Sequence, residues 1–135
     1  MDSRMKTFFR LWAPPIALCV AIFLQSSTVP PDVLPHFSHS DKAVHGVVFG
    51  ILALLLYRAF GSISWLGENP AFQAGAAVVA ATVYGISDEL HQAFVPMRTA
   101  DPWDAFADAM GAFLFVAGCR WFLRIRQPQM RGFVD

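Results

Sequence analysis

The chain has 135 residues, a length typical of one domain. Hydrophobic residues make up 56% of it, above the roughly 45–50% usual in soluble domains, and so small a soluble domain could not bury that much apolar surface. The formal net charge of zero argues against a nucleic-acid partner, because nucleic-acid binding requires a basic face.

Four apolar stretches predict the architecture. They are Phe8–Leu24, Ala43–Phe60, Pro70–Ser87 and Pro102–Leu123. With its flanks, each reaches or approaches the ~20 residues that a helix needs to cross a bilayer. Only helices satisfy every backbone group within a single segment in lipid. We therefore predict an all-α membrane bundle of four transmembrane helices, with one domain over residues 1–126 and a short cytoplasmic tail over 127–135.

The first stretch follows three basic residues in positions 4–10 and contains Pro14 and Pro15. We predict a retained membrane helix. The alternative is a signal peptide, because small residues at 26–28 could precede a cleavage site.

The later stretches carry clear start signals. Asn69-Pro70 and Asp101-Pro102 each place a capping residue before a proline at the first helical position. Gly46 and Gly50 form a pair of small residues one turn apart that lets helices approach closely, and Gly111 is expected to do the same.

The distribution of basic residues predicts the orientation. Most of them lie in the N-terminal segment, the second connection and the C-terminal segment, at Arg4, Lys6, Arg10, Arg58, Arg120, Arg124, Arg126 and Arg131. The first and third connections hold one each, Lys42 and Arg98. By the positive-inside rule, both termini are cytoplasmic and the first and third connections face outward. We expect a multi-pass protein of the inner (plasma) membrane.

On this topology, three separate stretches bring their ionisable residues to the outer side. Residues 41–45 begin the second helix, 88–92 end the third, and 98–108 lead into the fourth. Within the last stretch, Asp101, Asp104 and Asp108 follow one helical stripe. Charged residues inside the hydrocarbon are costly and usually mark function, so we expect a polar site here.

Acids outnumber bases at this site. The acids are Asp41, Asp88, Glu89, Asp101, Asp104 and Asp108, and the bases are Lys42 and Arg98. In a tight, partly dry pocket, some acids must be protonated, histidines must be charged, or a cation must bind. Oxygen ligands suit a divalent ion such as magnesium, manganese or calcium. Water inside the site could solvate the acids instead.

Simpler interpretations exist for single residues. Asp101 and Asp104 could be a cap and a third-position acid, as in a capping box. Lys42 could be an interfacial lysine that reaches toward water. His45 could be a core histidine bonded to Asp41. None of these explains the accumulation of carboxylates at one end.

These residues resemble a known family. Residues 41–45 are similar to the DKxxH opening of VanZ-like proteins, and residues 88–101 to their DExxQxFxPGRxxD block. Residues 104–111 are similar to the DxxxNxxG segment, and Ser26-Ser27 to a common serine pair. Two positions depart from the family: Met97 stands where glycine is usual, and Asp108 where asparagine is usual.

The resemblance implies a membrane protein with a role at the cell envelope, and the name of the family comes from a member linked to resistance to the glycopeptide teicoplanin. The expected partner is a membrane lipid or a lipid-linked envelope precursor. The residues expected to act as acids, bases or proton carriers are Asp88, Glu89, His45 and Asp104, and those expected to bind substrate are Lys42, Arg98, Gln92 and Asp101.

Whether the site is catalytic stays open, because the chain has no GxSxG, HExxH or phosphate-loop motif. The alternatives are a non-catalytic binding protein, a small transporter or a structural scaffold. The sequence does not indicate a cofactor.

Overall fold

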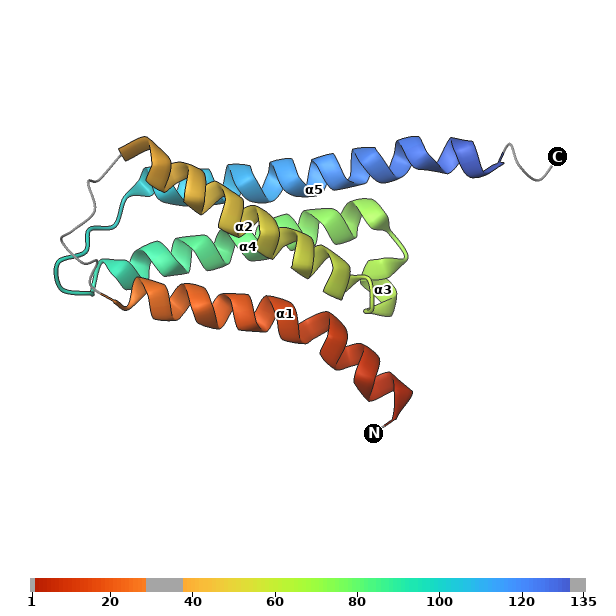
Figure 1. The fold of residues 1–135 in the computed structure, drawn as a ribbon, viewed down its shortest axis with the longest axis horizontal. Helices are drawn as coiled ribbons and strands as arrows, with labels where there is room; N and C mark the ends of the chain where they lie inside the picture. The colour runs from red at the N-terminus through yellow and green to blue at the C-terminus, as the bar shows by residue number, and fades with distance from the viewer. Residues whose placement is uncertain (1, 29–37, 132–135) are drawn as a thin grey trace.

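The computed structural model describes the backbone of residues 2–28 and 38–131 and the side chains of residues 2–28 and 42–126. Within these ranges the chain forms only helices (Figure 1). They are α1 (Ser3–Ser26), α2 (Ser38–Phe60), α3 (Ser64–Gly67), α4 (Pro70–Gln92) and α5 (Pro102–Arg131). Among the described residues, four helices are long and apolar enough to cross a membrane: α1, α2 from Lys42, α4, and α5 to Arg126. The predicted all-α bundle of four membrane helices is confirmed.

The helices run side by side, and α2 packs against α5, α4 and α1. The α4–α5 connection lies at one end of the bundle, together with the end of α1 and the start of α2 (Figure 1). We call this the polar end. The start of α1, the short helix α3 and the end of α5 lie at the opposite end. Consecutive long helices are therefore antiparallel, and with four of them the start of α1 and the end of α5 lie at the same end of the bundle.

Local sequence signals explain where two helices begin. Asn69 caps α4, because its Oδ1 accepts hydrogen bonds from the backbone N–H groups of Ala71 (3.0 Å) and Phe72 (3.2 Å). Asp101 does the same for α5, accepting from Trp103 N at 2.9 Å. Both predicted caps are confirmed.

Other boundaries differ from the prediction. The proline pair at 14–15 lies inside a continuous α1, which Figure 1 shows bending in that region, as helices do where proline removes a backbone hydrogen bond. The connection between α2 and α4 contains the unpredicted single-turn helix α3. Helix α5 extends beyond Leu123 to Arg131, so the segment expected to be a tail is helical over residues 127–131.

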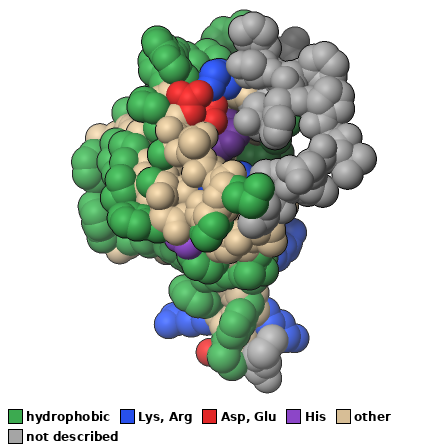
Figure 2. All heavy atoms as spheres, turned by 90° about the vertical axis from the view of Figure 1, so that its left-hand side faces the viewer, with side chains coloured by type: hydrophobic (Ala, Val, Ile, Leu, Met, Phe, Trp, Pro, Cys, Tyr) green, Lys and Arg blue, Asp and Glu red, His purple; other side chains and the backbone are tan. Residues whose placement is uncertain are grey.

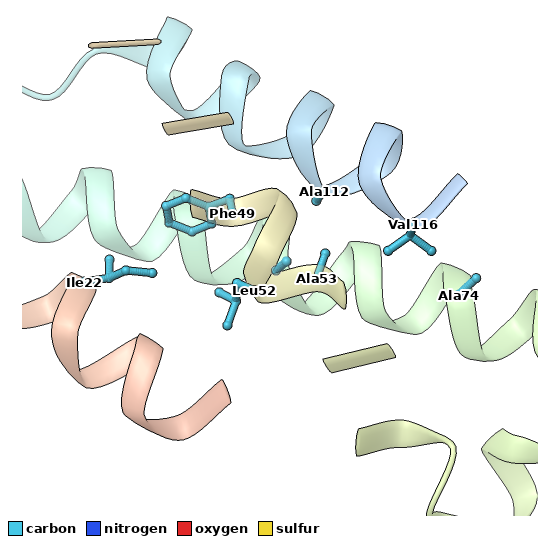
Figure 3. Packing of buried hydrophobic residues seen from close by; sticks show 8 residues of the cluster. Ile22, Phe49, Leu52, Ala53, Ala74, Ala112 and Val116 are labelled. Atoms are coloured by element: carbon cyan, nitrogen blue, oxygen red, sulfur yellow. The ribbon is translucent and has the colours of Figure 1, made fainter. Parts of the chain in front are cut away.

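The interior is built largely from small side chains (Figure 3). Its buried residues are Ile22, Phe49, Leu52, Ala53, Ala74, Ala81, Ala112 and Val116. Alanine lets the backbones approach closely, and close packing drives helix association where lipid is as apolar as the core. Many larger apolar side chains face outward instead, such as Val79 (61% exposed) and Phe113 (57% exposed), where lipid would cover them.

Candidate functional site

Nearly all buried polar side chains lie at the polar end. Among the described residues, these are Ser26, Asp88, Glu89, Gln92, Asp104 and Asp108, while Gln73 is buried at the opposite end. Figure 2 views the polar end and shows acidic side chains beside a basic one, with histidine close by. The predicted gathering of ionisable residues from separate stretches at one end is therefore present in the structure.

Lys42 joins the start of the second membrane span to the start of α5. Its Nζ donates to Asp101 Oδ2 at 2.5 Å and to Asp104 Oδ1 at 2.7 Å. The hydrogen bond from Lys42 holds the pKa of Asp101 below its usual range. Lys42 is therefore part of a partly exposed ion-pair network, a role that the interpretation as an interfacial lysine did not include.

Glu89 takes the place that the capping-box interpretation gave to Asp104. The backbone N–H of Asp101 donates to Glu89 Oε2 at 2.9 Å, while the Asp104 carboxylate turns to Lys42. The cap at Asp101 therefore exists, but its reciprocal acid comes from α4. This contact links the end of α4 to the start of α5.

His45 pairs with Asp108 in the interior. Its Nδ1 lies 3.1 Å from Asp108 Oδ1, and Asp108 is fully buried. The second carboxylate oxygen, Oδ2, has no hydrogen-bond partner among the described residues. It faces Gly85 of α4, where an added Cβ would lie 2.7 Å away. The side chain of Asp41, the partner proposed for His45 from sequence, lies outside the described side chains.

Asp88 and Gln92 connect α4 to the end of α1. Asp88 Oδ2 accepts from Ser26 Oγ at 2.9 Å and from Gln92 Nε2 at 3.0 Å. Gln92 Oε1 in turn accepts from Arg98 Nη1 at 3.3 Å. The serine pair thus belongs to the site through Ser26, while Ser27 contacts His91 at 2.9 Å outside the cavity described below.

Arg98 closes the end of α1. Its guanidinium donates to the carbonyl oxygens of Gln25 (2.9 Å) and Thr28 (3.0 and 3.2 Å). Gln25 is in the last turn of α1, whose carbonyl oxygens lack partners within the helix, and Thr28 lies two residues beyond its end. The preceding residue, Met97, has a φ of 64°, the left-handed conformation in which glycine is favoured. The position where the VanZ-like pattern usually has glycine therefore keeps the turn geometry with a methionine.

A cavity of about 400 Å³ lies between α1, α2 and α4. Its polar lining residues are Gln25, Ser26, His45, Asp88, Gln92 and Arg98. Its apolar lining residues are Leu18, Ala21, Ile22, Val44, Val48 and Phe49. Beside it, His45, Glu89 and Asp104 each offer one potential metal-ligand atom, and these atoms lie within 4.8 Å of one another. His45 is thus shared by the cavity and by this group.

The predicted site residues therefore fall into two connected parts. His45, Asp88, Gln92 and Arg98 line the cavity, whereas Lys42, Glu89, Asp101 and Asp104 form the network at the start of α5. Ser26 and Asp108 had no predicted role in catalysis or substrate binding, although Asp108 was counted among the acids of the site. The serine pair and the helical stripe through Asp108 were visible in the sequence, but nothing there indicated which helix each residue would face.

Comparison with known proteins agrees with this architecture. The family model VanZ/LLP1 matches residues 6–123, which include most or all of each of the four membrane-length helices and both parts of the site. No curated protein and no solved structure matches the chain significantly. The match spans well over half of the chain, and the chain therefore belongs to the VanZ/LLP1 family.

Proposed function

We propose that this protein binds the phosphate-bearing head group of a membrane lipid or of a lipid-linked envelope precursor in the cavity between α1, α2 and α4. The observation that carries the proposal is that the lining of the cavity changes from polar to apolar along the helices. Ser26, Asp88 and Arg98 lie near the polar end, while Ile22 and Phe49 line the cavity about one turn deeper. A lipid has the same order of polar head and apolar tail. The volume falls within the ~300–1,000 Å³ range of ligand pockets.

Arg98 supplies the positive charge for an anionic head group. Three of its hydrogen bonds, to carbonyl oxygens at and just beyond the end of α1, are 2.9–3.2 Å long and fix the guanidinium. The fourth, to Gln92, is the longest at 3.3 Å. A phosphate oxygen would replace this contact most easily, because arginine donates charge-assisted hydrogen bonds that are stronger than those to an amide. The amide oxygen of Gln92 would then be free to accept a hydrogen bond from the ligand.

Catalysis is a second candidate, and the His45–Asp108 pair favours it. A carboxylate that orients an imidazole is the arrangement of a general base. Among the described residues, no hydroxyl group bonds to His45. As a general base, His45 would therefore take a proton from a water molecule and not from a serine of this chain. We rank transport lower, because buried polar side chains gather at the polar end and only Gln73 of the described residues is buried at the other.

A lipid-retention experiment tests the binding proposal. The detergent-purified protein is mixed with phosphatidylethanolamine, phosphatidylglycerol or a polyprenyl phosphate, and bound lipid is counted by native mass spectrometry. We expect Arg98→Gln to weaken binding by about tenfold or more, the effect of losing one charge-assisted contact. The matched control is Arg124→Gln, an exposed arginine near the end of α5. Equal retention by both variants would overturn the proposal.

A cellular experiment separates a site from a scaffold. Asp88→Asn, Glu89→Gln, Arg98→Gln and Asp104→Asn are expressed singly, and membrane abundance is measured together with an envelope phenotype. We propose that teicoplanin susceptibility, the phenotype that the family resemblance implies, depends on this site. Normal abundance with a lost phenotype supports a functional site. Loss of the protein from the membrane in all four variants would support the scaffold.

A further inference from the structure

We infer that His45, Glu89 and Asp104 bind one divalent transition-metal ion, Mn²⁺ or Zn²⁺, beside the cavity. The three residues come from α2, α4 and α5, and their potential ligand atoms lie within 4.8 Å of one another. Glu89 and Asp104 are buried, and His45 is half-buried. This inference goes beyond head-group binding, because it requires no lipid.

The hydrogen bonds around the three residues leave ligand atoms available. Nδ1 of His45 is engaged by Asp108, so Nε2 is the nitrogen that would coordinate. Glu89 uses Oε2 for Asp101 N, while its Oε1 has only a long 3.5 Å contact with Gln92. A metal-bound histidine almost always donates its other N–H to a carboxylate or a carbonyl, and the His45–Asp108 pair has this arrangement.

The carboxylate of Asp108 provides a second, independent observation. It is 0% exposed and is aimed at the imidazole of His45, yet its Oδ2 has no hydrogen-bond partner among the described residues. A buried carboxylate oxygen that is left without a hydrogen bond is unfavourable. A dication on the far side of the imidazole would supply positive charge to Asp108 through His45.

The balance of charges at the polar end points the same way. Its described acids are Asp88, Glu89, Asp101, Asp104 and Asp108. Lys42 is shared by Asp101 and Asp104, and Arg98 is directed at the end of α1 and Gln92. Among the described ion pairs, neither Glu89 nor Asp108 has a lysine or arginine partner. One dication would neutralise this local excess.

The donor set indicates the type of metal. One imidazole with two carboxylates suits manganese or zinc better than calcium or magnesium, which favour oxygen ligands alone. From sequence, magnesium, manganese or calcium was expected; the imidazole favours manganese among these and adds zinc. Three protein ligands leave coordination positions open for water or for an oxygen of a ligand. Since His45 also lines the cavity, such a ligand could reach the ion from there.

The first test uses the metal alone. The purified wild-type protein is stripped with a chelator and titrated with MnCl₂, while free Mn²⁺ is followed by electron paramagnetic resonance, and ZnCl₂ is then added as a competitor. We expect one saturable site per chain and nitrogen coupling from imidazole in the pulsed spectrum of the bound ion. A folded wild-type protein that binds neither ion, or binds without nitrogen coupling, would overturn the inference.

Matched variants locate the site. We expect His45→Gln and Glu89→Gln to weaken binding by about tenfold or more, and His45→Gln to abolish the nitrogen coupling. The controls are His91→Gln and Glu68→Gln, which make the same replacements outside the ligand group. Equal losses in the controls would refute the assignment. Metal binding without lipid retention would overturn only the proposed function, and lipid retention without metal binding would overturn only this inference.

Discussion

Met97 shows how a local backbone strain supports the polar end. It is the one described non-glycine residue with a positive φ, at 64°, and it directly precedes Arg98. A side chain in this conformation costs roughly 1–2 kcal/mol, and the turn persists because Arg98 bonds to the carbonyls of Gln25 and Thr28. The strained residue thus directly precedes the arginine that bonds to the end of α1.

We predict that Met97→Gly raises the free energy of unfolding by up to about 1 kcal/mol, because relief of strain exceeds the entropy that glycine adds to the unfolded chain. Met97→Val should lower it by about 1 kcal/mol or more, since a β-branched residue fits this conformation poorly. Denaturation in mixed micelles measures both. A valine variant as stable as the glycine variant would contradict the left-handed conformation of residue 97.

The Lys42–Asp101 pair predicts a pH effect. The pKa of Asp101 is lower in the folded protein than its ordinary value of 3.8, so its contribution to stability is present above that pH and is lost as the pH falls further. We expect Lys42→Gln to return the carboxyl titration of Asp101 toward the ordinary value, as followed by ¹³C NMR in micelles. An unchanged titration curve would show that Lys42 does not hold Asp101.

At the scale of single residues, the sequence indicated which residues gather at the polar end, but not which side chains bond to one another. The helix ends and the order of polar stretches indicated that Asp88, Arg98 and Asp104 would meet at one end. Which acid would accept the N–H of Asp101 was not predictable, because Glu89 reaches it from another helix. The role of Arg98 was not predictable either, because it lies in the connection after α4 and its bonds are to residues at the end of α1.

At the scale of helices, α2 and α5 approach so closely that their backbones nearly touch. A Cβ on Gly111 would overlap the backbone of Gly46, and a Cβ on Gly50 would lie 2.6 Å from the ring of Phe115. The close approach expected from the small residues is confirmed. It also places His45 of α2 beside Asp108 of α5, so the glycines position the site.

We predict that Gly111→Ala forces α2 and α5 apart and lowers the free energy of unfolding by about 1–3 kcal/mol or more, the usual cost of overpacking. Gly118→Ala is the matched control on the same helix, because its Cβ would meet nothing within 4 Å. Unfolding in mixed micelles provides the comparison. Equal stability of the two variants would contradict the close packing.

At the scale of the whole molecule, the structure relates the two ends of the bundle. The start of α1, helix α3 and the end of α5 share one end, and the site lies at the other (Figure 1). Apolar stretches and caps predicted the four spans from sequence, whereas α3 and the extension of α5 carried no comparable signal. The basic residues predict the orientation, in which the site would lie on the outer side.

We predict that reporter enzymes fused at residue 135 and near Gly67 both report a cytoplasmic location, because the arginines concentrate at that end. A fusion near Pro96, in the connection between α4 and α5, serves as the opposite control and should report an outward location. An outward signal at residue 135 or near Gly67 would place the site on the cytoplasmic side and refute the orientation.

The proposed function rests on a lipid head group binding in the cavity at the polar end. Its most direct test is to label the protein in nanodiscs with a phospholipid that carries a photoreactive group on its head, and to map the labelled residues by mass spectrometry. We predict labelling at Ser26, Val44 and Gln92 that excess unlabelled lipid competes away and that Arg98→Gln reduces. Labelling confined to the outer faces of the helices and unchanged by Arg98→Gln would contradict it.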